Sequence, residues 1–242
     1  MSLELRNPHS VLAALKHRPH DVREIRCTSN SPGGAWEEAL LEAQSAGIPI
    51  SVSHRQGGGR RQRGQTERSS GTVALVKERS PASLEEILPT REAVPETGLW
   101  LALDCLQDPQ NVGAIFRSAS FFGIQGILMT KDRSAPMNST VYDVSAGGAE
   151  AVPFAVVTNL TQSLKIAKEC GLWVLGASEH AEKDVSQVDR GRPWVLVIGN
   201  EQKGIRRLTS EQCDEMCLIS PRGEVSSLNA SVAAGVLMSE LT

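Results

Sequence analysis

The sequence lacks any apolar run near the roughly 20 residues that a membrane-spanning helix needs. Residues 1–8 contain no apolar segment of the signal-peptide type. The five cysteines form no CxxC pair, and no histidine stands at a metal-ligand spacing from them, so neither a disulfide framework nor a zinc site is indicated. We therefore expect a cytoplasmic protein with reduced thiols, with neither a membrane nor a metal as partner.

Two glycine motifs of nucleotide enzymes are missing as well. There is no GxGxxG fingerprint, which counts against a dinucleotide-dependent oxidoreductase. The stretch Gly199–Gly204 has the glycine spacing of a P-loop, but Ile205 and Arg206 follow where lysine and a hydroxyl residue should stand. Nucleotide hydrolysis is therefore not expected.

What the sequence does contain is an uneven distribution of charge. With 242 residues, of which 40% are hydrophobic and 22% charged, the chain has room for one large core or two modest ones, and we expect two domains. Residues 1–80 hold 12 Lys and Arg against 8 Asp and Glu, a net of +4, whereas residues 81–242 hold 13 against 20, a net of −7. A basic first third on an acidic remainder predicts that the first part meets a polyanion.

The first part reads as a small α/β domain, residues 1–80. Apolar periodicity predicts helices over 10–15 and 35–46 and strands over 22–27, 48–52 and 72–76. Residues 54–71 cannot contribute to a core, because arginines stand there among glycines and glutamines. They are either a solvated surface loop or an arm for RNA phosphates, and the absence of aromatics argues against base stacking. The arginines are Arg55, Arg60, Arg61, Arg63 and Arg68.

Residues 81–97 are rich in proline and acidic residues and are predicted to be a linker with a helical turn near 84–88. From residue 98 onward, strands are expected at 99–103, 152–157, 172–177, 194–198 and 216–219, and helices at 160–170 and 228–241, with an apolar segment at 126–129. This alternation favours a parallel sheet in a second domain, residues 98–242. The small-residue stretch 144–149 receives no element.

One strand–loop–helix run organises this second domain. Leu99–Leu103 is continuously apolar, as in a strand covered on both faces, and Asp108-Pro109 should end it. Asn111 is the expected N-cap of a helix that ends at Gly123. Arg117 falls off the apolar stripe of this helix, on a face shared with Gly113 and Ser120. It is either an ordinary solvated arginine or part of a site, because ligands of open α/β sheets bind at the carboxyl ends of strands.

Two further loops follow later strands. Glu201 lies in the Gly199–Gly204 loop, where a glutamate by itself is unremarkable in function. The loop of residues 220–231 is crowded with hydroxyls at the start of the last helix. Ser226 or Ser227 fits the N-cap of that helix, and the free N–H groups there would equally hold an anion.

The three loops together resemble a known set of motifs. They read Asp108-Pro-x-Asn111-x-Gly113-x-x-x-Arg117, then Gly199-x-Glu201-x-x-Gly204, then Ser227-Leu-Asn229-Ala-Ser. Their order and spacing resemble the SpoU (TrmH-type) RNA 2′-O-ribose methyltransferases of the SPOUT, or α/β-knot, superfamily, over residues 98–242. Residues 1–80 are more loosely similar to the ribosomal-protein-like (L30e-like) RNA-binding domain of the large-subunit rRNA guanosine methyltransferases in that family.

The resemblance implies an α/β fold with a deep trefoil knot, a homodimer, an RNA substrate and S-adenosylmethionine as methyl donor. It implies that Arg117 is the catalytic residue. Because a guanidinium is normally never deprotonated, we expect Arg117 to bind the phosphate and the developing alkoxide rather than act as an ordinary base. Asn111 would orient Arg117 or the ribose, Glu201 would fix its loop and a partner arginine, and Ser227 with Asn229 would hold substrate and loop. The implied cofactor residues are Gly199, Ile219, Leu228, Ala177, Asn200 and Pro221.

Three alternatives remain open at this point. A tRNA could replace rRNA as the substrate, although the separate first domain favours rRNA. A homologue that has lost catalysis and only binds RNA is the second, and the intact site residues argue against it. The third is a nucleotide-dependent oxidoreductase, and the fingerprint glycines of that class are absent from this sequence.

Overall fold

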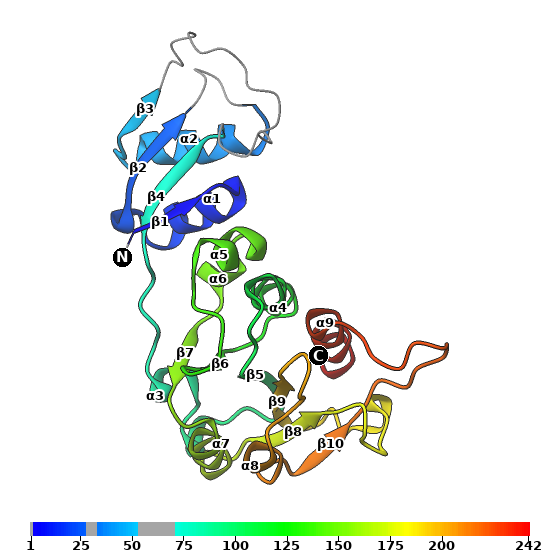
Figure 1. Cartoon of the computed structure of the whole chain (residues 1–242). Helices are drawn as coiled ribbons and strands as arrows, with labels where there is room; N and C mark the ends of the chain where they lie inside the picture. Colours follow the sequence, from blue (N-terminus) through cyan, green and yellow to red (C-terminus); the bar gives the residue numbers. More distant parts are fainter. Residues whose placement is uncertain (1, 28–32, 53–70) are drawn as a thin grey trace.

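The computed structural model describes residues 2–27, 33–52 and 71–242, and within them the chain forms two α/β units, one stacked on the other (Figure 1). The predicted arm with its five arginines lies outside the described residues. Among the helices of the described ranges, none is both long and apolar enough to cross a bilayer.

The smaller unit is a mixed sheet with two helices. Its strands lie in the order β1-β4-β2-β3, with β2 and β3 parallel and the other pairs antiparallel. The elements are β1 (Ser2–Leu5), α1 (Pro8–His17), β2 (Val22–Cys27), α2 (Ala35–Ser45), β3 (Ile50–Val52) and β4 (Val73–Lys77), with a 3-10 turn at Pro19–Asp21. The sequence predicted β2, β3, β4 and both α-helices, with ends shifted by up to two residues, but it did not predict β1.

The larger unit is an all-parallel sheet of order β10-β8-β9-β5-β6-β7. The prediction of a parallel α/β sheet is thus confirmed. Its strands are β5 (Gly98–Asp104), β6 (Ile127–Thr130), β7 (Phe154–Val157), β8 (Trp173–Ala177), β9 (Pro193–Gly199) and β10 (Glu215–Cys217). Its helices are α3 (Leu84–Ile87), α4 (Pro109–Phe121), α5 (Ser139–Ser145), α6 (Gly148–Ala151), α7 (Leu160–Glu169), α8 (Arg207–Ser210) and α9 (Ala230–Leu241), with 3-10 turns at Arg91–Ala93 and Val185–Gln187.

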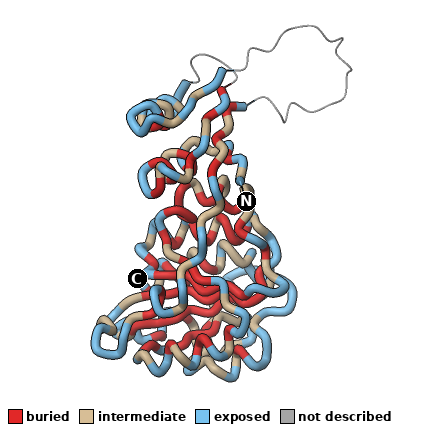
Figure 2. Tube along the Cα trace, turned by 90° about the vertical axis from the view of Figure 1, so that its left-hand side faces the viewer, coloured by how far each residue is buried: buried red, intermediate tan, exposed pale blue. Residues whose placement is uncertain are grey.

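The central strand β5 is buried on both faces, as its unbroken apolar run predicts. Leu99, Leu101 and Leu103 point into a core under α4 and α9. Trp100 and Ala102 point the other way, into a second core that α3 and α7 cover. Figure 2 shows the buried residues concentrated in these strands and continuing into the smaller unit. The first core indeed includes side chains of both units, so one apolar interior joins them.

Residues 81–97 connect the units along the sheet and make contacts of their own. Helix α3 forms there, as predicted, with Ser83 and Glu86 in a reciprocal capping box. Ile87 and Leu88 are buried, and the Trp100 indole N–H donates to the Ile87 carbonyl at 2.9 Å. This segment is therefore held against the sheet by its apolar side chains.

Residues 144–149, for which the sequence predicted neither a helix nor a strand, include the end of α5 and the start of the short α6. These two helices lie between α1 and α4 (Figure 1). This layer also corrects the environment expected for Gly113. A Cβ at Gly113 would lie 2.7 Å from Cβ of Val144, so Gly113 is buried against α5 and not beneath Arg117 in solvent.

Two predicted helix caps were wrong. Asp108, not Asn111, caps α4 by accepting from the Gln110 N–H. Asn229, not Ser226 or Ser227, caps α9. In both cases the true N-cap stands directly before the first helical residue, which frees Asn111 to point elsewhere.

Candidate functional site

A cavity of about 600 Å³ opens at the carboxyl ends of β8, β9 and β10. Three loops line it: the one after β8, the Gly199–Gly204 loop after β9, and the loop between β10 and α9. Ligands of parallel sheets bind at this edge. All six residues expected to bind a cofactor lie on its wall, namely Gly199, Ile219, Leu228, Ala177, Asn200 and Pro221, and so do Glu201 and Ser227.

The wall of this cavity suits a flat ligand with an apolar face and a polar edge. Leu228 is 50% exposed and Val225 75% exposed, so large apolar side chains are left uncovered there. The backbone N–H and C=O groups of Ile219 and Leu228 make no hydrogen bond within the described residues. Apolar side chains beside unused backbone groups are what an adenine ring requires from a binding pocket.

A chain of side-chain hydrogen bonds joins the three motif loops beside this cavity. The Asn229 amide donates from Nδ2 to Oδ1 of Asn111 at 2.9 Å. Asn111 in turn donates from its own Nδ2 to Oε1 of Glu201 at 3.2 Å. Asn229 meanwhile caps α9, since its Oδ1 accepts from the N–H groups of Ser231 and Val232. The contacts bridge separations of 118 and 90 residues, so this network fixes the three loops relative to one another.

Glu201 is the acceptor at the end of the network. Its carboxylate also receives the backbone N–H groups of Gln107 and Asp108, at 3.3 and 3.2 Å, and the side chain of Asn200. Partial burial by itself raises the pKa of the Glu201 carboxyl, but the accepted hydrogen bonds outweigh that effect and leave the pKa below its usual value. Glu201 is therefore held as a carboxylate that ties the β9 loop to the loop before α4.

Other polar contacts, which the sequence did not reveal, hold the loops in place. Buried Asp104, at the end of β5, accepts from Nε and the backbone N–H of Arg206 at 2.7 and 3.0 Å. Asp184 accepts from the backbone N–H and the hydroxyl of Ser220, and hydrogen bonds from Ser186 and Ser220 keep its pKa well below the usual range. The only sequence signal for these contacts was the charged Asp104 at the end of the apolar β5 run, and the sequence did not indicate which residue would pair with it.

Gly199 is required by the backbone itself. A Cβ there would lie 2.2 Å from the carbonyl carbon of Gly204, across the tight turn in which Asn200 and Gly204 exchange backbone hydrogen bonds. Nothing larger than glycine fits this approach without moving the loop.

Arg117 is placed differently from the other site residues. It is exposed on α4, and its guanidinium makes no hydrogen bond or ion pair within the described residues. It does not line the cavity, which the loops of the same chain form without it. The arginine that the resemblance implies to be catalytic is therefore not among the residues that line the cavity of its own chain.

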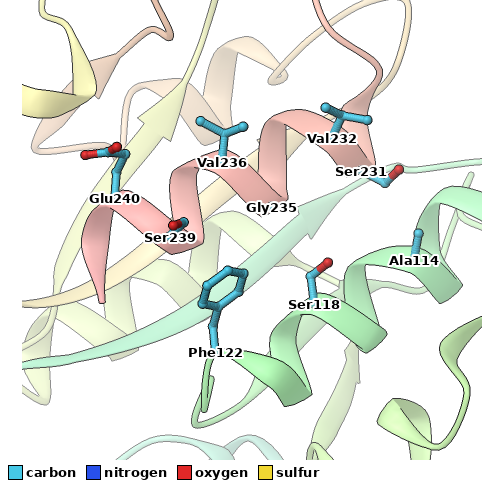
Figure 3. A pocket seen from close by; sticks show the side chains of 9 residues that line it. All are labelled: Ala114, Ser118, Phe122, Ser231, Val232, Gly235, Val236, Ser239 and Glu240. Carbon is cyan, nitrogen blue, oxygen red and sulfur yellow. The ribbon is translucent and has the colours of Figure 1, made fainter.

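Helices α4 and α9 form an open groove (Figure 3), and one of its lining residues, Ser118, directly follows Arg117 in the sequence. Small residues, among them Ala114 and Gly235, let the helices approach, and Val232 at its rim is 51% exposed. Phe121, on the same helix as Arg117, is 83% exposed. The groove is lined by Ala114, Ser118, Phe122, Ser231, Val232, Gly235, Val236, Ser239 and Glu240. A face with this much exposed apolar surface is characteristic of an interaction site.

Comparisons with known proteins agree with this arrangement. The model of the SpoU rRNA Methylase family matches residues 98–239. A protein from Pseudomonas aeruginosa named 23S rRNA (guanosine-2'-O-)-methyltransferase RlmB is 40% identical over 240 residues, covering 96% of this chain and 93% of that protein.

Two solved structures extend the comparison. The SpoU methyltransferase AviRb from Streptomyces viridochromogenes superposes with a TM-score of 0.78 at 23% identity, covering 99% of this chain and 88% of that one. The TrmH/SpoU tRNA modifying enzyme of A. aeolicus is 27% identical with a TM-score of 0.54, but it covers only 65% of this chain and 78% of its own. The matched residues contain all three motif loops and every residue that lines the cavity, so this chain belongs to the SpoU rRNA methylase family.

Proposed function

We propose that this protein transfers the methyl group of S-adenosylmethionine to the 2′-oxygen of a guanosine in 23S rRNA. The observation that carries the proposal is the Asn229–Asn111–Glu201 network, which ties the loop before α4 to the two motif loops that line the cavity. Family membership and the 40% identical relative, which is named for this reaction, support it. Residues 98–242 would carry out the transfer, residues 1–80 would bind RNA, and residues 81–97 would join the two.

The residues of the cavity fit the donor. Ile219 and Leu228 offer apolar side chains and unused backbone groups for the adenine, Ala177 and Pro221 also line the cavity, and Gly199 and Asn200 shape the loop after β9. When bound, S-adenosylmethionine supplies a methyl group that is already activated by its sulfonium, so the transfer needs no metal. The chain has to align the ribose hydroxyl and stabilise the negative charge that develops on its oxygen.

Arg117 is the residue that we assign to that charge. A guanidinium stays protonated at any physiological pH, and its planar donors bind a phosphate or an alkoxide well. Because nothing in the described residues engages it, the guanidinium is available to RNA. Ser227 lines the cavity, is exposed and makes no side-chain hydrogen bond in the described parts of the chain, so its hydroxyl is available to the substrate too.

We further propose a homodimer that pairs the α4–α9 groove with its copy. Two features support it: the exposed apolar side chains of Phe121 and Val232, and the absence of Arg117 from the cavity of its own chain. A symmetric pairing there would bring Arg117 of one copy to the cavity of the other. Each active site would then contain loops from one chain and the guanidinium from the second.

The remaining family features are proposed on similar grounds. A knot in the last segment is consistent with α9 packing against α4 and β9, although the preceding strand β10 lies at the far edge of the sheet. The L30e-like assignment of the first unit rests on its mixed sheet and two helices. A substrate in rRNA would place the activity in the cytoplasm.

An rRNA substrate is favoured over a tRNA by the extent of the similarity. The relative named for 23S rRNA matches 96% of this chain, including the first unit, whereas the tRNA modifying enzyme matches 65%. The first unit is thus shared with the rRNA enzyme. Mapping ribose methylation on rRNA and tRNA from cells with and without the protein would decide between them, and methylation of tRNA alone would refute our assignment.

The role of Arg117 is tested first by Arg117→Ala. We expect methyl transfer to be abolished while calorimetry with S-adenosylmethionine shows an affinity within about threefold of the wild type, because the guanidinium lies outside the donor cavity. Substantial residual turnover would refute the catalytic role. A protein that binds no donor at all would indicate an inactive homologue instead.

Mixing two inactive variants tests whether Arg117 acts across the dimer. Arg117→Ala retains the cavity, and Leu228→Glu places a charge on the cavity wall at a half-exposed position that folding should tolerate. If the site is shared, a mixed dimer contains one site with an intact cavity and an intact arginine, and activity returns. If each chain uses its own arginine, the mixture stays inactive.

A further inference from the structure

The small-residue layer of α5 and α6 contributes no residue to the cavity or to the Asn229–Asn111–Glu201 network. It lies between the smaller unit, which we propose binds RNA and call the RNA-binding unit below, and α4, the helix that carries Arg117 (Figure 1). On one side, residues 142–152 receive hydrogen bonds from the smaller unit. The Ser10 hydroxyl donates to the Tyr142 carbonyl at 2.6 Å, and Arg79 donates to the carbonyls of Ala149 and Val152, both at 2.8 Å.

A pair of glycines sets how closely this layer approaches its two neighbours. A Cβ on Gly147 would lie 3.0 Å from Cβ of Ala13 in α1. A Cβ on Gly148 would lie 2.4 Å from the Phe116 carbonyl oxygen and 2.9 Å from Cα of Arg117. Two adjacent residues therefore touch the RNA-binding unit and the backbone of the catalytic helix, with no side chain between them to absorb movement.

A buried ion pair holds the same layer to the RNA-binding unit. Arg18, at the end of α1, donates from Nε and Nη2 to the two carboxylate oxygens of Glu150 in α6, both at 2.7 Å. The side chains are 8% and 0% exposed. Arg18 also donates to the Lys77 carbonyl and to Asp21 of its own unit. The planar guanidinium is thus held on both sides of the boundary.

Such a pair is better suited to specifying an arrangement than to adding stability. Removing two charges from water largely cancels their attraction, and well-packed apolar side chains often replace a buried ion pair without loss of stability. Two parallel N–H···O bonds, however, are satisfied in only one relative orientation. Apolar side chains would keep the units together but would not fix their angle.

We propose that Arg18 and Glu150 are positioning residues for methyl transfer, which lock the RNA-binding unit in one orientation relative to Arg117 through Gly147 and Gly148. The inference rests on the proposed function. Its consequence is that the enzyme presents bound RNA to the active site as a single rigid body. Loss of the lock should then reduce delivery of the ribose to the site and leave RNA binding itself intact.

The test compares maximal rate with affinity. Single-turnover transfer of labelled methyl from S-adenosylmethionine to transcribed 23S rRNA gives the rate at saturating RNA and the RNA concentration at half that rate. For Glu150→Gln we expect the saturating rate to fall about tenfold or more, because small misplacements of a reacting group are costly. The half-saturating RNA concentration and the donor affinity should stay within about threefold.

Two further variants separate positioning from simple stability. The double variant Arg18→Met with Glu150→Leu leaves no unpaired buried charge, so its unfolding temperature should recover from that of Glu150→Gln while its saturating rate stays low. Glu38→Gln makes the same chemical change in the exposed pair of Lys16 and Glu38, within the smaller unit, and should leave the rate unchanged.

Hydrogen exchange measures how firmly the smaller unit is held against α5 and α6 in the absence of RNA and S-adenosylmethionine. Peptides covering residues 8–17 and 139–152 should exchange faster in Glu150→Gln than in the wild type. The proposal is overturned if the saturating rate of Glu150→Gln is unchanged, or if the double variant regains the wild-type rate together with its stability. It is also overturned if Glu38→Gln lowers the saturating rate as much as Glu150→Gln does. A wild-type enzyme that methylates no RNA would instead refute the proposed function itself.

Discussion

Replacing Asn229 by alanine removes two separate contributions from one side chain. Its Oδ1 caps α9 at the N–H groups of Ser231 and Val232, and its Nδ2 donates to Asn111. Loss of an Asn cap costs about 1 kcal/mol, and loss of one hydrogen bond costs about another 1 kcal/mol. We therefore expect Asn229→Ala to lower the free energy of unfolding by about 2 kcal/mol, which for a chain of this size lowers Tm by about 4–8 °C.

Asn229→Ser separates the two contributions. Serine is a good N-cap, but its side chain is too short to reach Asn111, so about half of the lost stability, about 1 kcal/mol, should return. Both variants should bind S-adenosylmethionine more weakly than the wild type, because both leave the last loop unlinked to Asn111 and Glu201. Ser227→Ala is the matched control, since Ser227 caps nothing and its loss should leave Tm unchanged.

Thermal unfolding followed by circular dichroism gives the stabilities, and calorimetry gives the donor affinity. The reasoning is refuted if Asn229→Ala unfolds at the wild-type temperature, or if Asn229→Ser is as unstable as the alanine variant. An unchanged donor affinity in both variants would show that the network does not order the cavity.

Three more predictions follow from the site. The pKa of Glu201 is lower in the folded protein than in the unfolded chain. The ionised carboxylate therefore stabilises the fold above about pH 4.3, and this stabilisation is lost as the pH falls through the folded-state pKa. Glu201→Gln should remove that part of the acid sensitivity, which unfolding curves at pH 3–6 would measure. Gly199→Ala should displace the β9 loop and abolish donor binding in calorimetry, whereas Gly223→Ala, whose Cβ would meet nothing within 4 Å, should bind normally. Val232→Asp should yield monomers in light scattering without harming α9, because an acid in the first turn suits the helix dipole; a dimer of unchanged stability would place the interface elsewhere.

The helix caps show where local sequence was insufficient. Asp108 and Asn111 are both good caps near Pro109, and nothing local distinguishes them. Asn111 is recruited by Glu201 and Asn229, which are 90 and 118 residues away, and only the fold brings these partners together. The α5–α6 layer escaped prediction for a similar reason, since its helices are stabilised by burial between α1 and α4 and not by helix propensity.

The sequence by itself determined the parallel sheet and the loops that bear the site. The unbroken apolar run Leu99–Leu103 can be satisfied only where both faces are covered, and the polar residues that follow must lie at the carboxyl edge. Only the tertiary structure decided that Arg117 lies outside the cavity of its own chain and that Arg18 meets Glu150. Both features depend on which residues, far apart in the sequence, come together in the fold. The order of residues along the chain does not indicate which of many possible polar partners the folded backbone brings within hydrogen-bond distance.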